Sequence, residues 1–487
     1  MSEFDLVITG GTVVAAGGTG TCDIGISGGR IETIGTGLGP ARRTIDATNR
    51  LVLPGGVDSH CHIEQLSASG LVNSDTFETA TRAAAAGGTT TVIPFAAQYE
   101  GMSLARVVGD YHALAEKGAI VDYALHMIIA DPSRAVLDEE LPALVASGHS
   151  SIKMFMTYDR LRLDDAQMLE VLAKARDLGA FVMVHAENHA MIVFMVNRLV
   201  ERGATAPKYH AVSHPRAGEA EAFTRLIAMS ELIDQPVMIF HVSSAGGAGV
   251  IGAARARGVK LFAETCTQYL LLTAGEMDKP GIEGAKWICS PPLRTTADQD
   301  ALWAALKRGD LQTVTSDHAP YSFDRNGKLT AGPNPGFKQI PNGMPGIQWR
   351  LPMLFDAMVS SGRMSLEDFV RLTSTASAEI YGLAPRKGRI VPGADADLVI
   401  WDASREVTLT DAMVNDGAGY NPYAGRTITG WPQMVIRRGE LIAEDGRVSA
   451  RPGSGMFLAR AAGEAARPSG RRQPEFDPAL NFGADIA

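Results

Sequence analysis

Apolar and polar residues follow different patterns in successive parts of the chain. From residue 5 to residue 53, short runs of Val, Ile and Leu are separated by glycine and polar residues, a pattern that predicts short strands joined by tight turns. We expect residues 1–53 to form the first part of a small β-sandwich. From residue 54 the rhythm changes to short apolar runs that alternate with alanine-rich helical stretches, which predicts βα units and a parallel sheet.

The apolar runs after residue 54 are numerous enough to close a barrel. They comprise residues 56–58, 89–93, 121–125, 151–155, 181–185, 237–241, 259–262 and 314–317. Parallel strands in this number, with helices between them, predict a (β/α)₈ barrel over residues 54–382. The active site of such a barrel lies at the carboxyl ends of its strands.

Strand signals punctuated by glycine return after the barrel, in residues 383–450. We expect these strands to complete the sandwich that residues 1–53 begin. Residues 451–487 are rich in Gly, Ala, Arg and Pro and lack strong periodicity. This composition predicts an extended or disordered tail. Alternatively, the arginines of this segment contact a neighbouring subunit.

Composition narrows the class of protein. The 487 residues include 45 Lys and Arg against 54 Asp and Glu, a formal net charge of −9, without a concentrated basic stripe before the last few dozen residues. Nucleic-acid binding is therefore not expected. The first residues do not resemble a secretory signal, and no run reaches the roughly 18 apolar residues of a membrane span, so we expect a cytoplasmic protein without membrane partners. The four widely spaced cysteines indicate neither disulfides nor a thiolate zinc site.

Potential metal ligands stand at the ends of the predicted barrel strands. His60 and His62 end the first strand and face the same way, because strand residues two apart share a face. One His-x-His pair is weak evidence, but His185 and His241 end two further strands and Asp317 ends the last. Imidazoles and carboxylates that converge on one barrel face can hold two metal ions and activate water.

Lys153 is unusual because it lies within the apolar strand 151–155. A buried ammonium group there would be costly, unless the side chain snorkels to the surface. The predicted site therefore includes a lysine, and the apolar strand pattern alone does not explain why its amine would be buried.

These residues together resemble the amidohydrolase superfamily, and more closely its cyclic-amidase branch, the dihydropyrimidinases and hydantoinases. The resemblance extends from residue 54 to about residue 440, and its markers occur in the family's order. The markers are residues 54–62, 153–158, 185–187, 241–244, 264–269, 290–294, 316–318 and 340–343.

The resemblance implies a centre of two divalent metal ions. The implied ligands are His60, His62 and Asp317 for one ion and His185 and His241 for the other. Lys153, converted by carbon dioxide to N6-carboxylysine, and a water or hydroxide would bridge the two ions. The nitrogen-rich ligand set favours zinc, with manganese and cobalt as alternatives.

The resemblance also implies roles at the substrate. Asp317 would take a proton from the bridging hydroxide and return it to the departing nitrogen, with a role as ligand only as the alternative. Tyr158 would donate a hydrogen bond to the developing oxyanion, unless it is a packing tyrosine. Ser290 and Asn342 match positions that bind the imide edge of a ring, largely through backbone groups.

The implied activity opens dihydropyrimidines or 5-substituted hydantoins to N-carbamoyl amino acids, in a homotetramer or dimer. The alternatives are another cyclic amide, such as allantoin, dihydroorotate or a cyclic imide, or a scaffold homologue without catalysis. All six ligand positions are present, which argues against a scaffold. The sequence departs from the hydantoinase pattern at Gln65, where polar residues replace an apolar stretch after the acidic Glu64. The lack of an arginine shortly after His62 disfavours dihydroorotase.

Several other features are expected to have structural roles. His318 follows Asp317 directly, so we expect it to support the site without binding metal. Residues 244–249 lack the Lys and Ser or Thr of a phosphate loop and predict a tight turn. The remaining histidines fall outside the strand-end pattern; they are His112, His126, His149, His189, His210 and His214.

Overall fold

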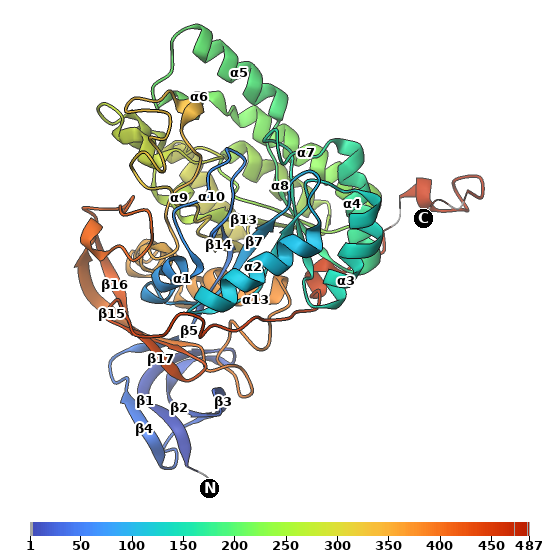
Figure 1. Cartoon of the computed structure of the whole chain (residues 1–487). Helices are drawn as coiled ribbons and strands as arrows, with labels where there is room; N and C mark the ends of the chain where they lie inside the picture. Colours follow the sequence, from blue (N-terminus) through green and yellow to red (C-terminus); the bar gives the residue numbers. More distant parts are fainter. Residues whose placement is uncertain (1–2, 472, 485, 487) are drawn as a thin grey trace.

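Residues 4–54 and 398–448 contain the strands of one sheet, at the lower end of the molecule in Figure 1. The computed structural model describes residues 3–471, 473–484 and 486. The nine strands of this sheet are β1 (Phe4–Ala15), β2 (Gly18–Ser27), β3 (Arg30–Gly35), β4 (Ala41–Asp46), β5 (Leu51–Pro54), β15 (Leu398–Thr408), β16 (Thr427–Arg437), β17 (Glu440–Glu444) and β18 (Arg447–Val448). Strand β5 pairs with both β1 and β15, and thereby joins the two terminal segments. The sheet has its own buried cluster, which includes Ile24, Val52 and Ile400.

A second sheet forms the barrel. Its strands are β6 (Gly56–Cys61), β7 (Thr89–Ala97), β8 (Asp122–Tyr123), β9 (His126–Ile128), β10 (Ser151–Phe155), β11 (Phe181–His185), β12 (Val237–Ile239), β13 (Leu261–Cys266) and β14 (Thr313–Thr315). Neighbouring strands pair in parallel. The N–H group of His62 donates to the carbonyl oxygen of His318 at 2.6 Å, so the chain after β14 meets the chain after β6. The predicted barrel with a smaller β-domain is confirmed, whereas the boundaries at residues 53 and 382 stay predictions.

Helices surround the barrel strands (Figure 1). They are α1 (Phe77–Ala86), α2 (Leu104–Gly118), α3 (Leu141–Ala146), α4 (Asp165–Leu178), α5 (His189–Glu201), α6 (Tyr209–Ser213), α7 (Arg216–Ile233), α8 (Ala245–Ala256), α9 (Thr267–Leu271), α10 (Thr296–Arg308), α11 (Arg350–Phe355), α12 (Leu366–Val370) and α13 (Ala376–Ile380). In the described part of the chain, we find no helix with the length and apolar character needed to cross a membrane.

The glycine-rich residues 244–249 form the start of α8 and not the expected turn. Ser244 caps the helix by accepting a hydrogen bond from the N–H group of Gly247. A Cβ atom at Gly247 would come within 2.7 Å of the Phe223 ring on α7. Glycine is therefore needed here for close packing of two helices, which local turn signals do not report.

The segment that follows the β-domain is extended and packs on the barrel of its own chain. The N–H group of Tyr123 donates to Met456, and the N–H group of Leu458 donates back to Tyr123. Arg460 is buried and donates to the carbonyl oxygen of Leu125 and to Ser151 Oγ, at 2.6 Å each. This part of the predicted tail is thus an ordered element, and the chain end projects beyond it at the right of Figure 1.

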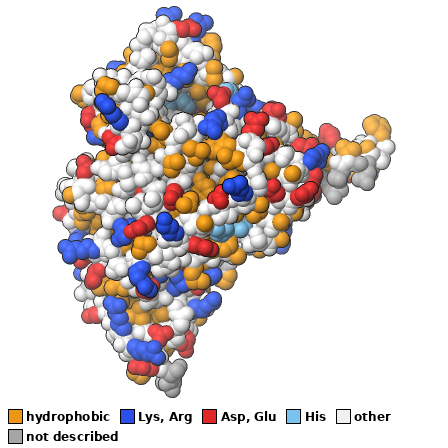
Figure 2. All heavy atoms as spheres, in the orientation of Figure 1, with side chains coloured by type: hydrophobic (Ala, Val, Ile, Leu, Met, Phe, Trp, Pro, Cys, Tyr) orange, Lys and Arg blue, Asp and Glu red, His pale blue; other side chains and the backbone are white. Residues whose placement is uncertain are grey.

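Charged side chains of both signs are interspersed on the face shown in Figure 2. On that face no single sign of charge forms a broad patch.

Candidate metal centre

One cavity of about 750 Å³ collects all the residues that the sequence singled out. They are His60, His62, Lys153, Tyr158, His185, His241, Ser290, Asp317 and Asn342. The metal-ligand candidates lie on or directly after the barrel strands, so the parallel sheet brings together side chains that are far apart in sequence.

The first group of donors consists of His60, His62 and Asp317. Asp317 Oδ1 lies 3.1 Å from His60 Nε2 and 3.3 Å from His62 Nε2. The three ligand atoms are close enough together to hold one metal ion. Asp317 has a φ of 45°, in the left-handed region that costs a non-glycine residue energy and that often occurs at functional sites.

The second group of donors consists of His185 and His241. His185 Nδ1 and His241 Nε2 face each other at 2.8 Å. His185 is the last residue of β11, and His241 follows β12 with a φ of 42°. Two ring nitrogens directed at one point, at the ends of neighbouring parallel strands, provide two ligands for a second ion.

Lys153 lies on β10 and is 1% exposed. Its Nζ atom has no hydrogen-bond partner among the residues that the structure describes. Burial lowers the pKa of Lys153 to about 7, so a substantial fraction of the amine is neutral near neutral pH. A buried amine without a partner, beside convergent imidazoles, fits a lysine that acquires further atoms and binds metal through them.

Carboxylates and an amide orient the histidine rings by pairing with one nitrogen of each ring. His60 Nδ1 pairs with Glu264 and His62 Nδ1 pairs with Gln65 Oε1, the latter at 2.7 Å. His185 Nε2 lies 2.8 Å from Glu187. Such partners fix the ring orientation and tautomer of a metal ligand.

The sequence reasoning gave no role to Glu187, Glu264 or Gln65 as partners of the histidine ligands. Glu187 and Glu264 do lie within family markers, which was the only available signal for them. Gln65 was noted only as a departure near the substrate, yet its amide oxygen is engaged with a metal-ligand candidate. It therefore belongs to the histidine-orienting set as well as to the cavity lining.

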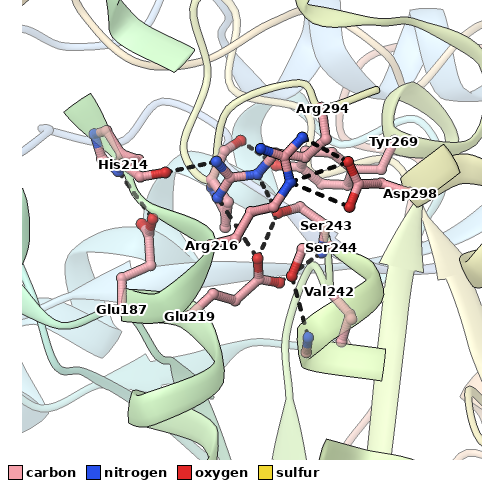
Figure 3. A network of polar contacts seen from close by, with 12 residues as sticks. Glu187, His214, Arg216, Glu219, Val242, Ser243, Ser244, Tyr269, Arg294 and Asp298 are labelled. Carbon is pink, nitrogen blue, oxygen red and sulfur yellow. Dashed lines mark hydrogen bonds and ion pairs between the residues drawn. The ribbon is translucent and has the colours of Figure 1, made fainter. Parts of the chain in front are cut away.

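A wider polar network holds these partners in place (Figure 3). Glu187 also pairs with His214 Nδ1 at 2.8 Å, and Arg294 donates to the carbonyl oxygen of His214. Arg294 Nε donates to Ser243 Oγ at 3.1 Å, and Glu219 accepts from both the N–H and the Oγ–H of Ser243 at 2.8 Å. Because Ser243 follows His241 by two residues, the network connects the surroundings of both histidines of the second group.

The charge state of Asp317 follows from its neighbours. Burial raises the pKa of Asp317, but the charge of His60 and hydrogen bonds from His60 and His62 outweigh burial and hold that pKa well below its ordinary value. The carboxylate is therefore ionised at neutral pH. It is available as a metal ligand and as a proton acceptor.

Tyr158, Ser290 and Asn342 also line the cavity. Burial raises the pKa of Tyr158, while Ser290 and Asn342 near its hydroxyl group oppose this effect. The phenol thus stays protonated and can donate a hydrogen bond. Tyr158 has a φ of 72°, so its backbone is held in a conformation that few tyrosines adopt.

Three histidines outside the strand-end pattern also line the cavity: His189, His210 and His214. They come from α5, α6 and the loop after α6, which is why a rule based on strand ends did not find them. His318 is buried and pairs with Asp75 at 2.6 Å. His112 and His149 pair with each other at 2.8 Å.

Comparison with known proteins gives the family. Residues 51–442 match the amidohydrolase family. A D-hydantoinase of Ralstonia pickettii is 42% identical over 457 residues, which cover 94% of this chain and 99% of that protein. A solved D-hydantoinase structure is 42% identical, with a TM-score of 0.91 over 94% of this chain and 99% of the other. The dihydropyrimidinase from Brevibacillus agri is 38% identical, with a TM-score of 0.91 over the same shares of the two chains.

The family and the donor set together support a binuclear metal centre. The resemblance noted in the sequence is confirmed, since both sequence and fold match over more than nine tenths of the chain. The chain belongs to the amidohydrolase family, within its hydantoinase and dihydropyrimidinase branch.

Proposed function

We propose that this protein is a metal-dependent hydrolase that opens hydantoins and dihydropyrimidines to N-carbamoyl amino acids. The observation that carries the proposal is that the two donor groups and the buried Lys153 converge in one cavity, which Tyr158 also lines. The names of the relatives, D-hydantoinase and dihydropyrimidinase, support the choice of ring. A cytoplasmic location and a homotetramer or dimer remain part of the proposal.

The proposed ligands divide the site into two. His60, His62 and Asp317 would hold one divalent ion, His185 and His241 would hold the other, and Lys153 as N6-carboxylysine would supply further oxygen ligands. Zinc suits this nitrogen-rich set. When bound, such ions would lower the pKa of a coordinated water towards about 7 and would polarise a substrate carbonyl oxygen.

The side chains supply the remaining steps. Asp317, kept ionised by its histidine neighbours, accepts the proton of the attacking water and returns it to the ring nitrogen as the amide bond breaks. Tyr158 donates a hydrogen bond to the carbonyl oxygen as negative charge develops there. Ser290 and Asn342 hold the imide edge of the ring, so that the scissile carbonyl faces the metal ligands.

Hydrolysis of five rings in parallel tests this function: hydantoin, dihydrouracil, allantoin, dihydroorotate and succinimide. Zinc-replete protein is expected to open hydantoin and dihydrouracil, with the N-carbamoyl product identified by mass spectrometry. The Asp317→Asn variant controls for contaminating activity, because it lacks the proton acceptor. Inactivity of the wild-type protein on both preferred rings would reject the proposal, and turnover of one of the other three would name the substrate in its place.

A further inference from the structure

Lys328 is a buried lysine in the loop after β14, outside the set of metal-ligand candidates. Its side chain is 0% exposed. Nζ donates to the carbonyl oxygen of Ile288 at 2.8 Å and to that of Pro341 at 2.7 Å. One amine thus connects two chain segments that are more than fifty residues apart in sequence.

Both segments lead directly into the proposed substrate-binding residues. Ile288 precedes Ser290 by two residues, and Pro341 directly precedes Asn342. The N–H group of Gly343 also donates to the carbonyl oxygen of Ile288, at 3.0 Å. Lys328 therefore adds a second connection at the place where the two segments meet.

The surroundings leave these segments little freedom. Gly343 has a φ of 146°, and a Cβ atom there would lie 2.2 Å from the carbonyl oxygen of Ala319. The segment that contains Asn342 therefore packs against the backbone of Ala319, which is two residues after Asp317. Lys328 itself is held by a tight turn in which its N–H group donates to the carbonyl oxygen of Ser322 at 2.8 Å.

Burying a lysine amine is costly, so its hydrogen bonds indicate a specific arrangement. Burial lowers the pKa of Lys328 to about 7. An ammonium group has three N–H donors and a neutral amine has two, so either form can satisfy both carbonyl oxygens. The connection is consequently independent of the charge of Lys328.

We propose that Lys328 is a positioning residue that holds the segments of Ser290 and Asn342 at the separation needed to bind the imide edge of the ring. This inference rests on the proposed function, since it assigns the two segments to substrate binding. Lys328 acts through backbone carbonyl groups, and the hydrogen-bond partners of its Nζ atom among the described residues, Ile288 and Pro341, are not metal-ligand candidates. Its loss should therefore weaken ring binding more than it slows the chemical step.

The test compares Lys328→Met, which removes both hydrogen bonds, with Lys328→Gln, whose amide keeps two N–H donors without a charge. Lys307→Met, at an exposed position of α10, is the matched control. KM and kcat are measured for hydantoin and dihydrouracil, bound metal by elemental analysis, and the folded state by circular dichroism. We expect Lys328→Met to raise KM about tenfold with kcat changed less than about threefold and the metal content unchanged. Lys328→Gln should recover part of the KM, and Lys307→Met should match the wild type.

An unchanged KM in Lys328→Met would overturn the inference, and so would equal losses of kcat and bound metal. If Lys328→Met does not fold, Lys328→Gln decides, because it retains donors for both carbonyl groups. Unfolding of both variants would also overturn the inference, by making Lys328 a requirement for folding. Failure of the proposed function looks different, because the wild-type protein itself would then leave both rings intact.

Discussion

The Nζ atom of Lys153 lies 3.8 Å from the centroid of the Phe240 ring. Two further phenylalanine rings, those of Phe95 and Phe155, lie within 5.5 Å of the same atom. Aromatic faces attract a cation, but they do not replace the hydrogen bonds that a buried amine loses on leaving water. The conversion of this amine to a carbamate with metal-bound oxygens would remove that deficit.

Replacement of Tyr158 by Phe should lower kcat for hydantoin by about 10²–10³-fold, because one hydrogen-bond donor to the developing oxyanion is lost. The metal content should stay the same, since the phenol is not one of the proposed ligands. Steady-state kinetics and elemental analysis measure the two quantities. A kcat within about threefold of the wild type would assign Tyr158 to packing only.

Replacement of Glu264 by Gln should weaken metal binding by about 10–100-fold, because Glu264 orients the ring of His60 through Nδ1. Titration of metal-free protein with zinc, followed by calorimetry, gives the affinity. Glu116→Gln, at an exposed position of α2, serves as the control. Equal zinc affinities of Glu264→Gln and the wild type would show that this partner does not support the centre.

Replacement of Arg460 by Met should lower the free energy of unfolding by about 2–3 kcal/mol, because buried hydrogen-bond acceptors lose their donor. Arg467→Met is the matched control, since the Arg467 side chain is 71% exposed and its change should stay within about 0.5 kcal/mol. Denaturant titration measures both. If the two variants are equally stable, the segment after residue 451 contributes little to the barrel.

The stability of the protein should fall in mild acid, in part through His149. Burial, followed by the charge of His112, lowers the pKa of His149 from 6.5 to about 4. The unfolded chain, with the ordinary pKa, binds the proton more readily between these values, so stability declines as the pH falls from 6.5 towards 4. His149→Gln should therefore lose less unfolding free energy than the wild type between about pH 7 and pH 5. Identical losses would mean that the environment of His149 does not favour its neutral form.

Local sequence patterns predicted the parts of the site that depend on strand ends. His185 ends an apolar run of five residues, and the same rule placed His60, His62 and Asp317 at the mouth of the barrel. The rule works because the carboxyl ends of all parallel barrel strands lie on one side. Lys153 stood out for a different physical reason, the cost of a buried amine.

The side chains that hydrogen-bond to the proposed ligands, or that hold the substrate-binding segments, could not be predicted from strand ends. The apolar run predicts a strand at residues 259–262, which does not include Glu264, but the strand is Leu261–Cys266 and places Glu264 within it, beside His60. Lys328 reaches its two carbonyl groups through a loop without a strand or helix signal. Contacts of this kind depend on how distant loops pack, which periodicity along the chain does not encode.

Anomalous X-ray scattering at the zinc edge, on crystals of zinc-loaded protein, can locate the two proposed metal ions. We expect two metal peaks, one among His60, His62 and Asp317 and the other between His185 and His241, with density for a carboxylated Lys153 reaching both. The Lys153→Met variant should lose the bridging density and at least one of the peaks. Wild-type crystals with metal peaks elsewhere, or with an unmodified Lys153 amine remote from both ions, would rule out the proposed binuclear centre.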